Sequence, residues 1–354
     1  MTIHEILWVV TYLLLTIIVA VIIGAWIYIR RKRCFEMVSH FGTAESRRTA
    51  HPPVPGNHPN VLEDQPFEEC TRESGFFEGM WWQAIIPKNP PSALVVIVHG
   101  YGDHSDFVML NHANKIVAKT NAAVFLFDQH GFGRSDGLWA FIPNWFIHVG
   151  SCRRMVGFAK KKFPGLKTIG VGYSMGGGVL TTIEALQPIL DGMILLAPML
   201  VIREEMKPPP LVRSMLTLVA QFFPTWPVAV SSHNGQLSYR DAAFRAKEHE
   251  LNKLQYPGFP RLGTAVSMLS AQQWLEENCY RVNCPFLVMH GTADVVTAIE
   301  GSRRLMAMTP PELDKQMITM EGYRHHLLGP SQDAHFNEKP YNIICEWIIS
   351  KTQS

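Results

Sequence analysis

The chain has 354 residues, 47% of them hydrophobic, so it is long enough to bury a large core, as one α/β domain with an insertion. Its formal net charge of +2 predicts no nucleic-acid surface. The six cysteines are scattered, with no C-x-x-C pair and no zinc-like spacing with histidine, which argues against a zinc module and predicts free thiols in a reducing compartment.

The first expected element is a membrane-spanning helix that begins at Ile6 and ends at Ile29. This run carries no charged residue and would be about 36 Å long as a helix, enough to cross a bilayer. No Lys or Arg precedes it, as a cleaved signal peptide would require, and a basic cluster follows it at 30–33. By the positive-inside rule, residues 1–33 are predicted to be an anchor, with the domain that follows in the cytosol on an endomembrane such as the endoplasmic reticulum.

Residues 34–66 are Pro-rich and aperiodic, which predicts a juxtamembrane tether. Beyond it, short apolar runs of strand length alternate with helix-like stretches. This alternation predicts an α/β fold with a mainly parallel sheet and helices on both faces. The α/β core is expected in two parts, 67–199 and 279–354, with a helical cap inserted at 200–278. The expected strands are 93–98, 122–127, 168–173, 193–197, 286–289 and 316–320.

The stretch 167–180, KTIGVGYSMGGGVL, places a serine at the end of an expected strand. Gly172 and Gly176 flank Ser174 in a G-x-S-x-G pattern, whose small residues let a strand turn sharply into a helix. Such a turn would project the Ser174 hydroxyl above the sheet, beside helix N-terminal amides, which predicts a nucleophile. A pattern this short also arises by chance, so its surroundings must decide.

A serine hydroxyl becomes a useful nucleophile only when a neutral imidazole accepts its proton and a carboxylate orients that imidazole. Asp294 and His325 each follow a later expected strand, so the chain order is Ser, Asp, His, the order of α/β-hydrolases. The strand that leads into HGYG is expected to aim the Tyr101 amide into the pocket opposite the Met175 amide. These two amides are the predicted oxyanion hole.

Two alternatives compete with this assignment. His326 adjoins His325, and either imidazole could be the base. Asp128, in FLFDQHGFGRSDG, also follows a strand and could rival Asp294. Asp128 lies before the nucleophile, however, and its glycine-rich setting is more typical of a structural loop.

The motifs HGYGDHS, DQHGFGRSDG, GYSMGGG, LLAPM, HGTAD and EGYRH occur in that order. Together they resemble the monoacylglycerol lipase family of α/β-hydrolases, over roughly residues 70–350. The segment NKLQYPGFPRLGTAVSML at 252–269 is similar to the cap of the plant-type branch, which includes lysophospholipases and caffeoylshikimate esterases. The resemblance implies an eight-stranded type of sheet, Ser174 as nucleophile, Asp294 as acid, and His325 as base through the G-x-x-H ending at 322–325. It also implies the Tyr101 and Met175 amides as oxyanion hole.

The resulting hypothesis is a membrane-anchored serine hydrolase that cleaves fatty-acyl esters of monoacylglycerol or lysophospholipid through an acyl-enzyme, with no metal or organic cofactor. A small phenolic ester or thioester hydrolase and an acyltransferase remain alternatives on the same triad. A catalytically silent, membrane-tethered binding module is a further alternative, but such a module usually has a broken triad. The stretch 211–223, LVRSMLTLVAQFF, gives the cap an apolar face that either faces lipid or packs on the core.

Overall fold

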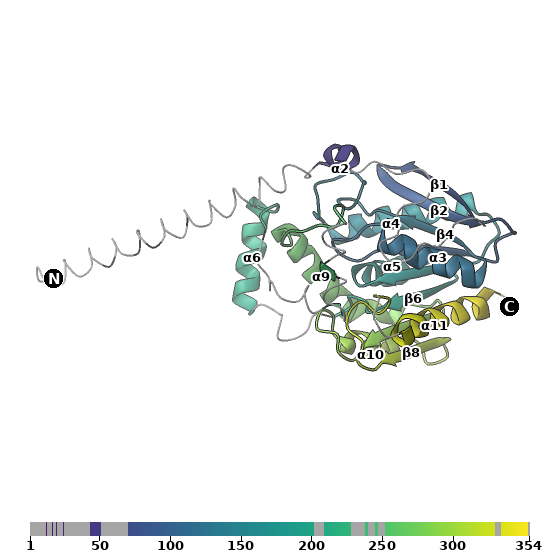
Figure 1. The fold of residues 1–354 in the computed structure, drawn as a ribbon. Helices are drawn as coiled ribbons and strands as arrows, with labels where there is room; N and C mark the ends of the chain where they lie inside the picture. The colour runs from purple at the N-terminus through teal and green to yellow at the C-terminus, as the bar shows by residue number, and fades with distance from the viewer. Residues whose placement is uncertain are drawn as a thin grey trace, which may run out of the picture.

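The computed structural model describes residues 12, 16, 19, 24, 43–50, 70–201, 209–227, 238–239, 245–246, 252–329 and 334–352. Within these ranges the chain forms one central sheet with helices packed against it (Figure 1). The predicted membrane span at 6–29 lies outside the described residues except for single positions. No helix within the described ranges has the length and hydropathy that a bilayer span requires.

The sheet has eight strands in the order β1-β2-β4-β3-β5-β6-β7-β8. The six strands from β3 to β8 match the runs expected from the sequence and pair in parallel. They are β3 (Leu94–Val98), β4 (Ala123–Phe127), β5 (Thr168–Tyr173), β6 (Gly192–Leu196), β7 (Phe286–Gly291) and β8 (Lys315–Met320). The predicted α/β fold with a mainly parallel sheet is therefore confirmed, and the carboxyl ends of these strands meet along one edge.

An antiparallel hairpin that was not expected from the sequence extends the sheet. Strands β1 (Cys70–Phe77) and β2 (Met80–Pro87) pair with each other, and β2 pairs with β4. Glu78 and Gly79 form the two-residue turn with φ angles of 48° and 75°. Positive φ at both turn positions matches the right-handed twist of a hairpin, which explains why glycine stands at the second one.

Helices cover both faces of the sheet, as predicted. On one face, α4 (Trp145–Lys162), α5 (Met175–Leu186) and α10 (Ile299–Met308) contribute to a large apolar core. On the other face, α3 (Val108–Thr120) and α11 (Ala334–Thr352) close a second core. Because the central strands are buried on both sides, their side chains form nearly continuous apolar runs.

The described part of the cap contains α6 (Pro210–Phe222) and α9 (Leu262–Asn278), followed by a 3₁₀ turn at Cys279–Arg281. Helix α9 packs against α4 and α5, and α6 packs on α9 (Figure 1). No residue of α6 is buried, and the side chains of Leu211 and Phe222 are 73% and 71% exposed. The interpretation in which this apolar face packs on the core is therefore wrong for α6.

The predicted tether at 34–66 is interrupted by a short helix, α2 (Ala44–Ala50), which is fastened to the core. Arg47 is fully buried and donates hydrogen bonds to the carbonyls of Gly133 (2.6 Å), Ser135 (2.7 Å) and Gly137 (3.3 Å). The prediction that residues 34–66 form a tether is therefore wrong for residues 43–50. The Pro-rich composition around them hid a helix whose one buried side chain is Arg47.

Candidate active site

Ser174 lies in a sharp turn between β5 and α5, where its φ and ψ are 49° and −112°. Such values are rare for a residue with a side chain and mark a backbone conformation that the surroundings enforce. The Ser174 amide donates to the Leu196 carbonyl (2.9 Å), while its carbonyl accepts from the amides of Gly178 (3.2 Å) and Met199 (2.9 Å). These bonds hold the turn, and the hydroxyl remains free to face the pocket.

The glycines around Ser174 are required by close backbone contacts. A Cβ atom at Gly176 would lie 2.0 Å from the Val98 carbonyl oxygen, and one at Gly177 would lie 2.7 Å from the Pro198 side chain. At Gly172 a Cβ would meet the backbone of Gly177 at 2.7 Å. Only glycine lets α5 start this close to β3 and β5, which is the condition for a nucleophile turn of this kind.

Asp294 and His325 are brought together as predicted. The Nδ1 atom of His325 lies 2.8 Å from the Oδ2 atom of Asp294, whose side chain is almost completely buried. His325 lines the same pocket as Ser174, although no hydrogen bond joins the serine hydroxyl to the imidazole. Contacts of this kind often tighten only when a substrate is bound.

Two further side chains hold Asp294, and neither was assigned from the sequence. Thr297 donates its hydroxyl to Oδ2 (2.9 Å) and its amide to Oδ1 (3.1 Å). The buried ring of His290 places Nε2 3.3 Å from Oδ2 and is itself fixed by Ser302 at 2.8 Å. Burial alone would raise the pKa of Asp294, but the hydrogen bonds from His290 and His325 hold that pKa well below its usual range. The carboxylate therefore stays ionised and oriented.

His326 occupies a different environment from His325. Its ring stacks on Tyr239 with centroids 3.9 Å apart, and its amide donates to the Ser238 carbonyl (3.0 Å). Removal from water, together with the neighbouring His325, lowers the pKa of His326 to about 3. On the other side of His325, Arg324 donates a hydrogen bond to the Tyr239 carbonyl (3.1 Å). Arg324 and His326, which flank His325, therefore both contact the 238–239 segment of the cap. Asp294 forms its hydrogen bond with His325 and not with His326.

The Tyr101 amide lies in the loop after β3, and the Met175 amide begins α5 directly after Ser174; Tyr101 and Ser174 line the same pocket. Within the described part of the chain, neither amide donates a hydrogen bond to another residue. Gly100 brings the first loop close, because a Cβ there would contact the Ser174 side chain at 3.4 Å. Two unpaired donors flanking a serine are the arrangement that an oxyanion requires.

A buried histidine and glutamine fix the loop that carries the Tyr101 amide. The amide of Gln129 donates to Nε2 of His99 (3.0 Å), and the side-chain amide of Gln129 donates to the His99 carbonyl (2.8 Å). Burial lowers the pKa of His99 to about 4, so its ring stays neutral and accepts through Nε2. Nδ1 is then the protonated nitrogen, and it donates to the Gly100 carbonyl at 2.8 Å.

Asp128, the alternative acid, has a structural role. Its carboxylate accepts from the amides of Ser105 (2.6 Å) and Arg134 (2.7 Å), and it is fully buried. A Cβ at Gly133 would lie 2.1 Å from the Asp128 carboxylate, so the glycine makes room for this packing. Asp128 therefore ties the oxyanion loop to the glycine-rich loop, as its motif indicates, and does not meet His325.

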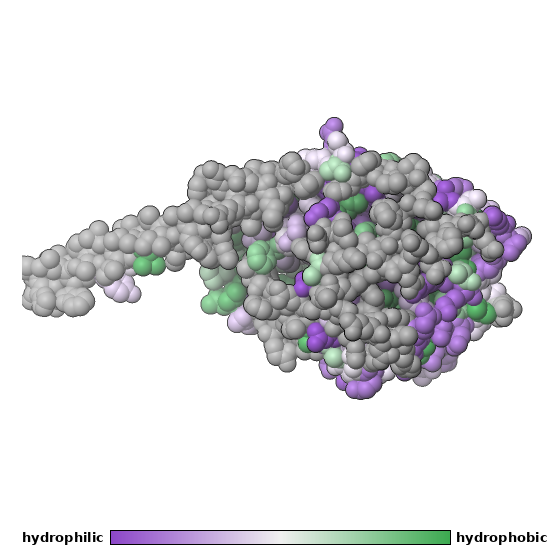
Figure 2. Space-filling view, in the orientation of Figure 1, coloured by the Kyte–Doolittle hydropathy of each residue, from purple (hydrophilic) through white to green (hydrophobic). Residues whose placement is uncertain are grey.

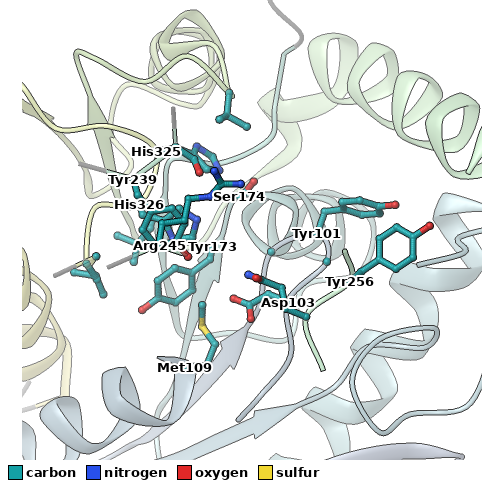
Figure 3. A pocket seen from close by; sticks show the side chains of 18 of the residues that line it. Tyr101, Asp103, Met109, Tyr173, Ser174, Tyr239, Arg245, Tyr256, His325 and His326 are labelled. Atoms are coloured by element: carbon teal, nitrogen blue, oxygen red, sulfur yellow. The ribbon is translucent and has the colours of Figure 1, made fainter. Parts of the chain in front are cut away.

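The pocket above Ser174 has a volume of about 520 Å³ and is formed by the ends of the strands and by the cap (Figure 3). Its walls are largely aromatic and apolar. They include Tyr101, Tyr173, Tyr239, Tyr256 and Phe259. Among the described residues, no three His, Cys, Asp or Glu side chains are grouped in a way that would hold a metal ion. The arrangement suits nucleophilic attack on a carbonyl whose substituents are mainly apolar.

The family described as "Serine aminopeptidase, S33" matches residues 89–332, which include Ser174, Asp294 and His325. The chain belongs to this family of α/β-hydrolases. It is 27% identical to caffeoylshikimate esterase of Arabidopsis thaliana over 333 residues, which cover 88% of this chain and 97% of that protein. It is 24% identical to monoacylglycerol lipase of Mycolicibacterium smegmatis, with 79% and 98% of the two chains covered.

Solved structures agree with the family on the fold. The crystal structure of a soluble variant of monoglyceride lipase from Saccharomyces cerevisiae, in complex with a substrate analog, has a TM-score of 0.66 and 18% identity, and 85% of this chain and all of that chain are covered. The predicted resemblance to the monoacylglycerol lipase family is thus confirmed. With this family and these relatives, the chain is a carboxylic ester hydrolase.

Proposed function

We propose that the protein cleaves fatty-acyl esters of monoacylglycerol or lysophospholipid, with Ser174 as nucleophile, His325 as base and Asp294 as the acid that orients it. The observation that carries the proposal is the 2.8 Å contact between His325 and Asp294 in the pocket that contains Ser174. It supports the base assignment because a fixed Nδ1–H tautomer leaves Nε2 of His325 free to accept the serine proton.

The reaction follows from these groups. The Ser174 hydroxyl attacks the ester carbonyl while His325 takes its proton, and the oxyanion of the tetrahedral intermediate accepts hydrogen bonds from the Tyr101 and Met175 amides. The imidazolium then protonates the departing alcohol, which leaves the acyl group on Ser174. Water, deprotonated by His325, attacks this acyl-enzyme and releases the fatty acid.

The assignment to long-chain esters rests on the walls of the pocket and on relatives named as monoacylglycerol and monoglyceride lipases. The exposed apolar face of α6 supports it, since a lipid substrate must leave an aggregate or a bilayer before it enters the pocket. The relative named caffeoylshikimate esterase keeps a smaller phenolic ester as the second candidate.

The proposal includes a membrane anchor at residues 6–29, with the hydrolase on the cytosolic side of an endomembrane. It is supported by the uncharged run and by the basic cluster that follows at 30–33. Because α2 is fastened to the core from Ala44 onward, about ten residues separate that cluster from the catalytic domain. A flexible chain of that length spans about 17 Å, which would keep the domain close to the surface.

Single substitutions at the site test the proposal. Ser174→Ala should remove turnover of every ester and labelling by a fluorophosphonate, with no loss of folding, because alanine fits the turn but cannot attack. His325→Ala should reduce kcat by about the same factor, on the order of 10⁴ or more, because members of a triad act as a unit.

His326→Ala is the matched control for His325→Ala. It removes an adjacent ring that stacks on Tyr239 and makes no contact with Asp294, so most of the turnover should remain. Equal losses in the two variants would contradict the assignment of the base. Turnover or labelling that survives Ser174→Ala would contradict the nucleophile.

A further inference from the structure

The pocket contains one charged side chain that the proposed chemistry does not use. Arg245, from the cap, lines the pocket together with Ser174 and His325. Figure 3 shows its side chain extending toward these two residues. Arg245 is half-buried, and within the described part of the chain it has no carboxylate partner or hydrogen bond.

The pocket also contains one negatively charged side chain, which lies away from Arg245. Among the described residues that line the pocket, Asp103 is the one acid and Arg245 the one Arg or Lys. Asp103 accepts a hydrogen bond from the His104 amide (2.9 Å), and in Figure 3 it lies on the side of Tyr101. Arg245 lies on the side of His325 and Tyr239. The two charges therefore define two ends of the site and do not cancel as a pair.

Among the described residues, no carboxylate pairs with Arg245. Tyr239 and His326 form the stacked pair beside it, and the positive charge of Arg245 is one of the influences that keep His326 neutral. A half-buried guanidinium without a partner loses part of its hydration, and its planar donors match an oxyanion in two-point contact. Such a group is favourable when the ligand supplies the missing negative charge.

We propose that Arg245 binds an anionic oxygen group of the substrate, a phosphate or a carboxylate, so that the enzyme prefers anionic esters to neutral monoacylglycerols. The proposal rests on the proposed function of the triad, since Arg245 acts on the ester that Ser174 attacks. The anion would lie at the His325 end of the site, away from Asp103, whose carboxylate would repel it. The substrate class is then a lysophospholipid with an exposed phosphate, or an ester that carries a free carboxylate.

The test compares esters that differ in charge. Full-length enzyme is assayed with 1-oleoylglycerol, with 1-oleoylglycerol 3-phosphate in mixed micelles of the same detergent, and with a caffeoyl ester of a hydroxylated carboxylic acid. In Arg245→Gln, the ratio of kcat/KM for the preferred anionic ester to that for 1-oleoylglycerol should fall about 10- to 100-fold, the range of a charge-assisted contact. Arg245→Lys should recover part of the ratio, because it restores the charge but not the two-point geometry.

Arg324→Gln is the matched control. Arg324 is also an arginine beside His325, but its guanidinium donates to the Tyr239 carbonyl and it does not line the pocket. Its substitution should leave the ratio of anionic to neutral turnover unchanged, even if overall turnover changes. A fall confined to the phosphate ester identifies a lysophospholipid, and a fall confined to the carboxylate ester identifies an acid ester.

An unchanged ratio in Arg245→Gln would overturn this proposal, as would an equal fall for charged and neutral esters. Neither result would affect the proposed function, which is contradicted by activity that survives Ser174→Ala or by equal losses in His325→Ala and His326→Ala. The two failures are therefore distinguishable in the same set of assays.

Discussion

Helices α5 and α6 have nearly the same length, 12 and 13 residues, and both are rich in apolar side chains, yet they end in opposite environments. Every residue of α5 except Leu186 is buried, whereas no residue of α6 is. In Figure 2 hydrophobic surface is visible at the side of the molecule where Figure 1 places α6. Apolar composition alone does not determine which helix joins the core.

The difference lies in how closely the backbone can approach its neighbours. The run of glycines at the start of α5 lets the helix touch β3 and the 198–199 loop, so its apolar side chains fall directly on the sheet. Helix α6 begins with prolines, and among the described elements it packs mainly on α9. Its outward face, which includes Leu211, Met215 and Leu218, is left without a cover among the described residues. Helix α5 therefore forms part of the active site, whereas the apolar face of α6 is exposed and available for a contact outside the core.

The largest expected effect comes from adding one methyl group to α5. Gly176→Ala would place a Cβ 2.0 Å from the Val98 carbonyl oxygen, a contact that only a shift of the backbone can relieve. We expect the variant to lose about 4 kcal/mol or more of unfolding free energy, or to fail to fold. Urea unfolding followed by circular dichroism measures the change.

Gly150→Ala is the matched control, since it adds the same methyl group inside a helix. At Gly150 the new Cβ would meet only the end of the Arg154 side chain, at 3.8 Å. Helix propensity then favours alanine by about 1 kcal/mol, so this variant should be as stable as the wild type or more stable. A Gly176→Ala protein that unfolds at the same urea concentration would show that the close approach is not needed.

The next effect concerns α2, which lies at the surface like α6 but is fastened. Arg47→Met removes three hydrogen bonds to loop carbonyls at a site closed to solvent, and the carbonyls are left unpaired. We expect a loss of about 2 to 4 kcal/mol in the same urea assay.

Arg48→Met provides the comparison on the neighbouring residue. Arg48 pairs with Asp136 at 2.8 Å and donates one hydrogen bond to the Arg134 carbonyl (2.6 Å), but a third of its side chain and more than half of that of Asp136 are exposed. A surface pair and one partly exposed hydrogen bond together contribute about 1 kcal/mol, less than the three buried bonds of Arg47. Equal losses for the two variants would mean that α2 is not fastened through Arg47.

How far the sequence predicts the structure depends on how local the signal is. Ser174, Asp294 and His325 each follow a strand within a short motif, so their places could be predicted from the chain itself. The contact of His290 with Asp294 could not, because a histidine inside a buried strand gives no sign of what its ring will meet. One clue was available, since His290 belongs to the same HGTAD motif as Asp294.

The elements that were missed lack such signals or have signals that compete. The two strands of the β1–β2 hairpin are joined by a Glu-Gly pair, which is a weaker turn signal than Asn-Gly or Asp-Gly. In addition, β2 has apolar side chains on both faces, so it lacks the alternation typical of a hairpin strand. Helix α2 has no apolar face, and its one buried residue is Arg47. Burial of a single arginine against distant carbonyls is a tertiary event that hydrophobic periodicity cannot predict.

The smallest expected effect tests α6 itself. Leu211→Gln and Leu218→Gln together change side chains that are 73% and 58% exposed, so the unfolding free energy should stay within about 0.5 kcal/mol of the wild type. If the face contacts lipid, the double variant should lose turnover of long-chain monoacylglycerol in vesicles relative to a short water-soluble ester. Partial burial of one leucine is worth about 1.5 kcal/mol, which corresponds to roughly a tenfold fall in that ratio.

Ile147→Gln controls for the loss of an exposed apolar side chain elsewhere. Ile147 is 69% exposed on α4, outside the cap and the pocket, so its substitution should change neither stability nor the ratio of the two rates. If the α6 variant keeps the wild-type ratio, its apolar face has no role at the lipid surface. If it loses stability instead, the face is covered by protein, and the contrast between α5 and α6 disappears.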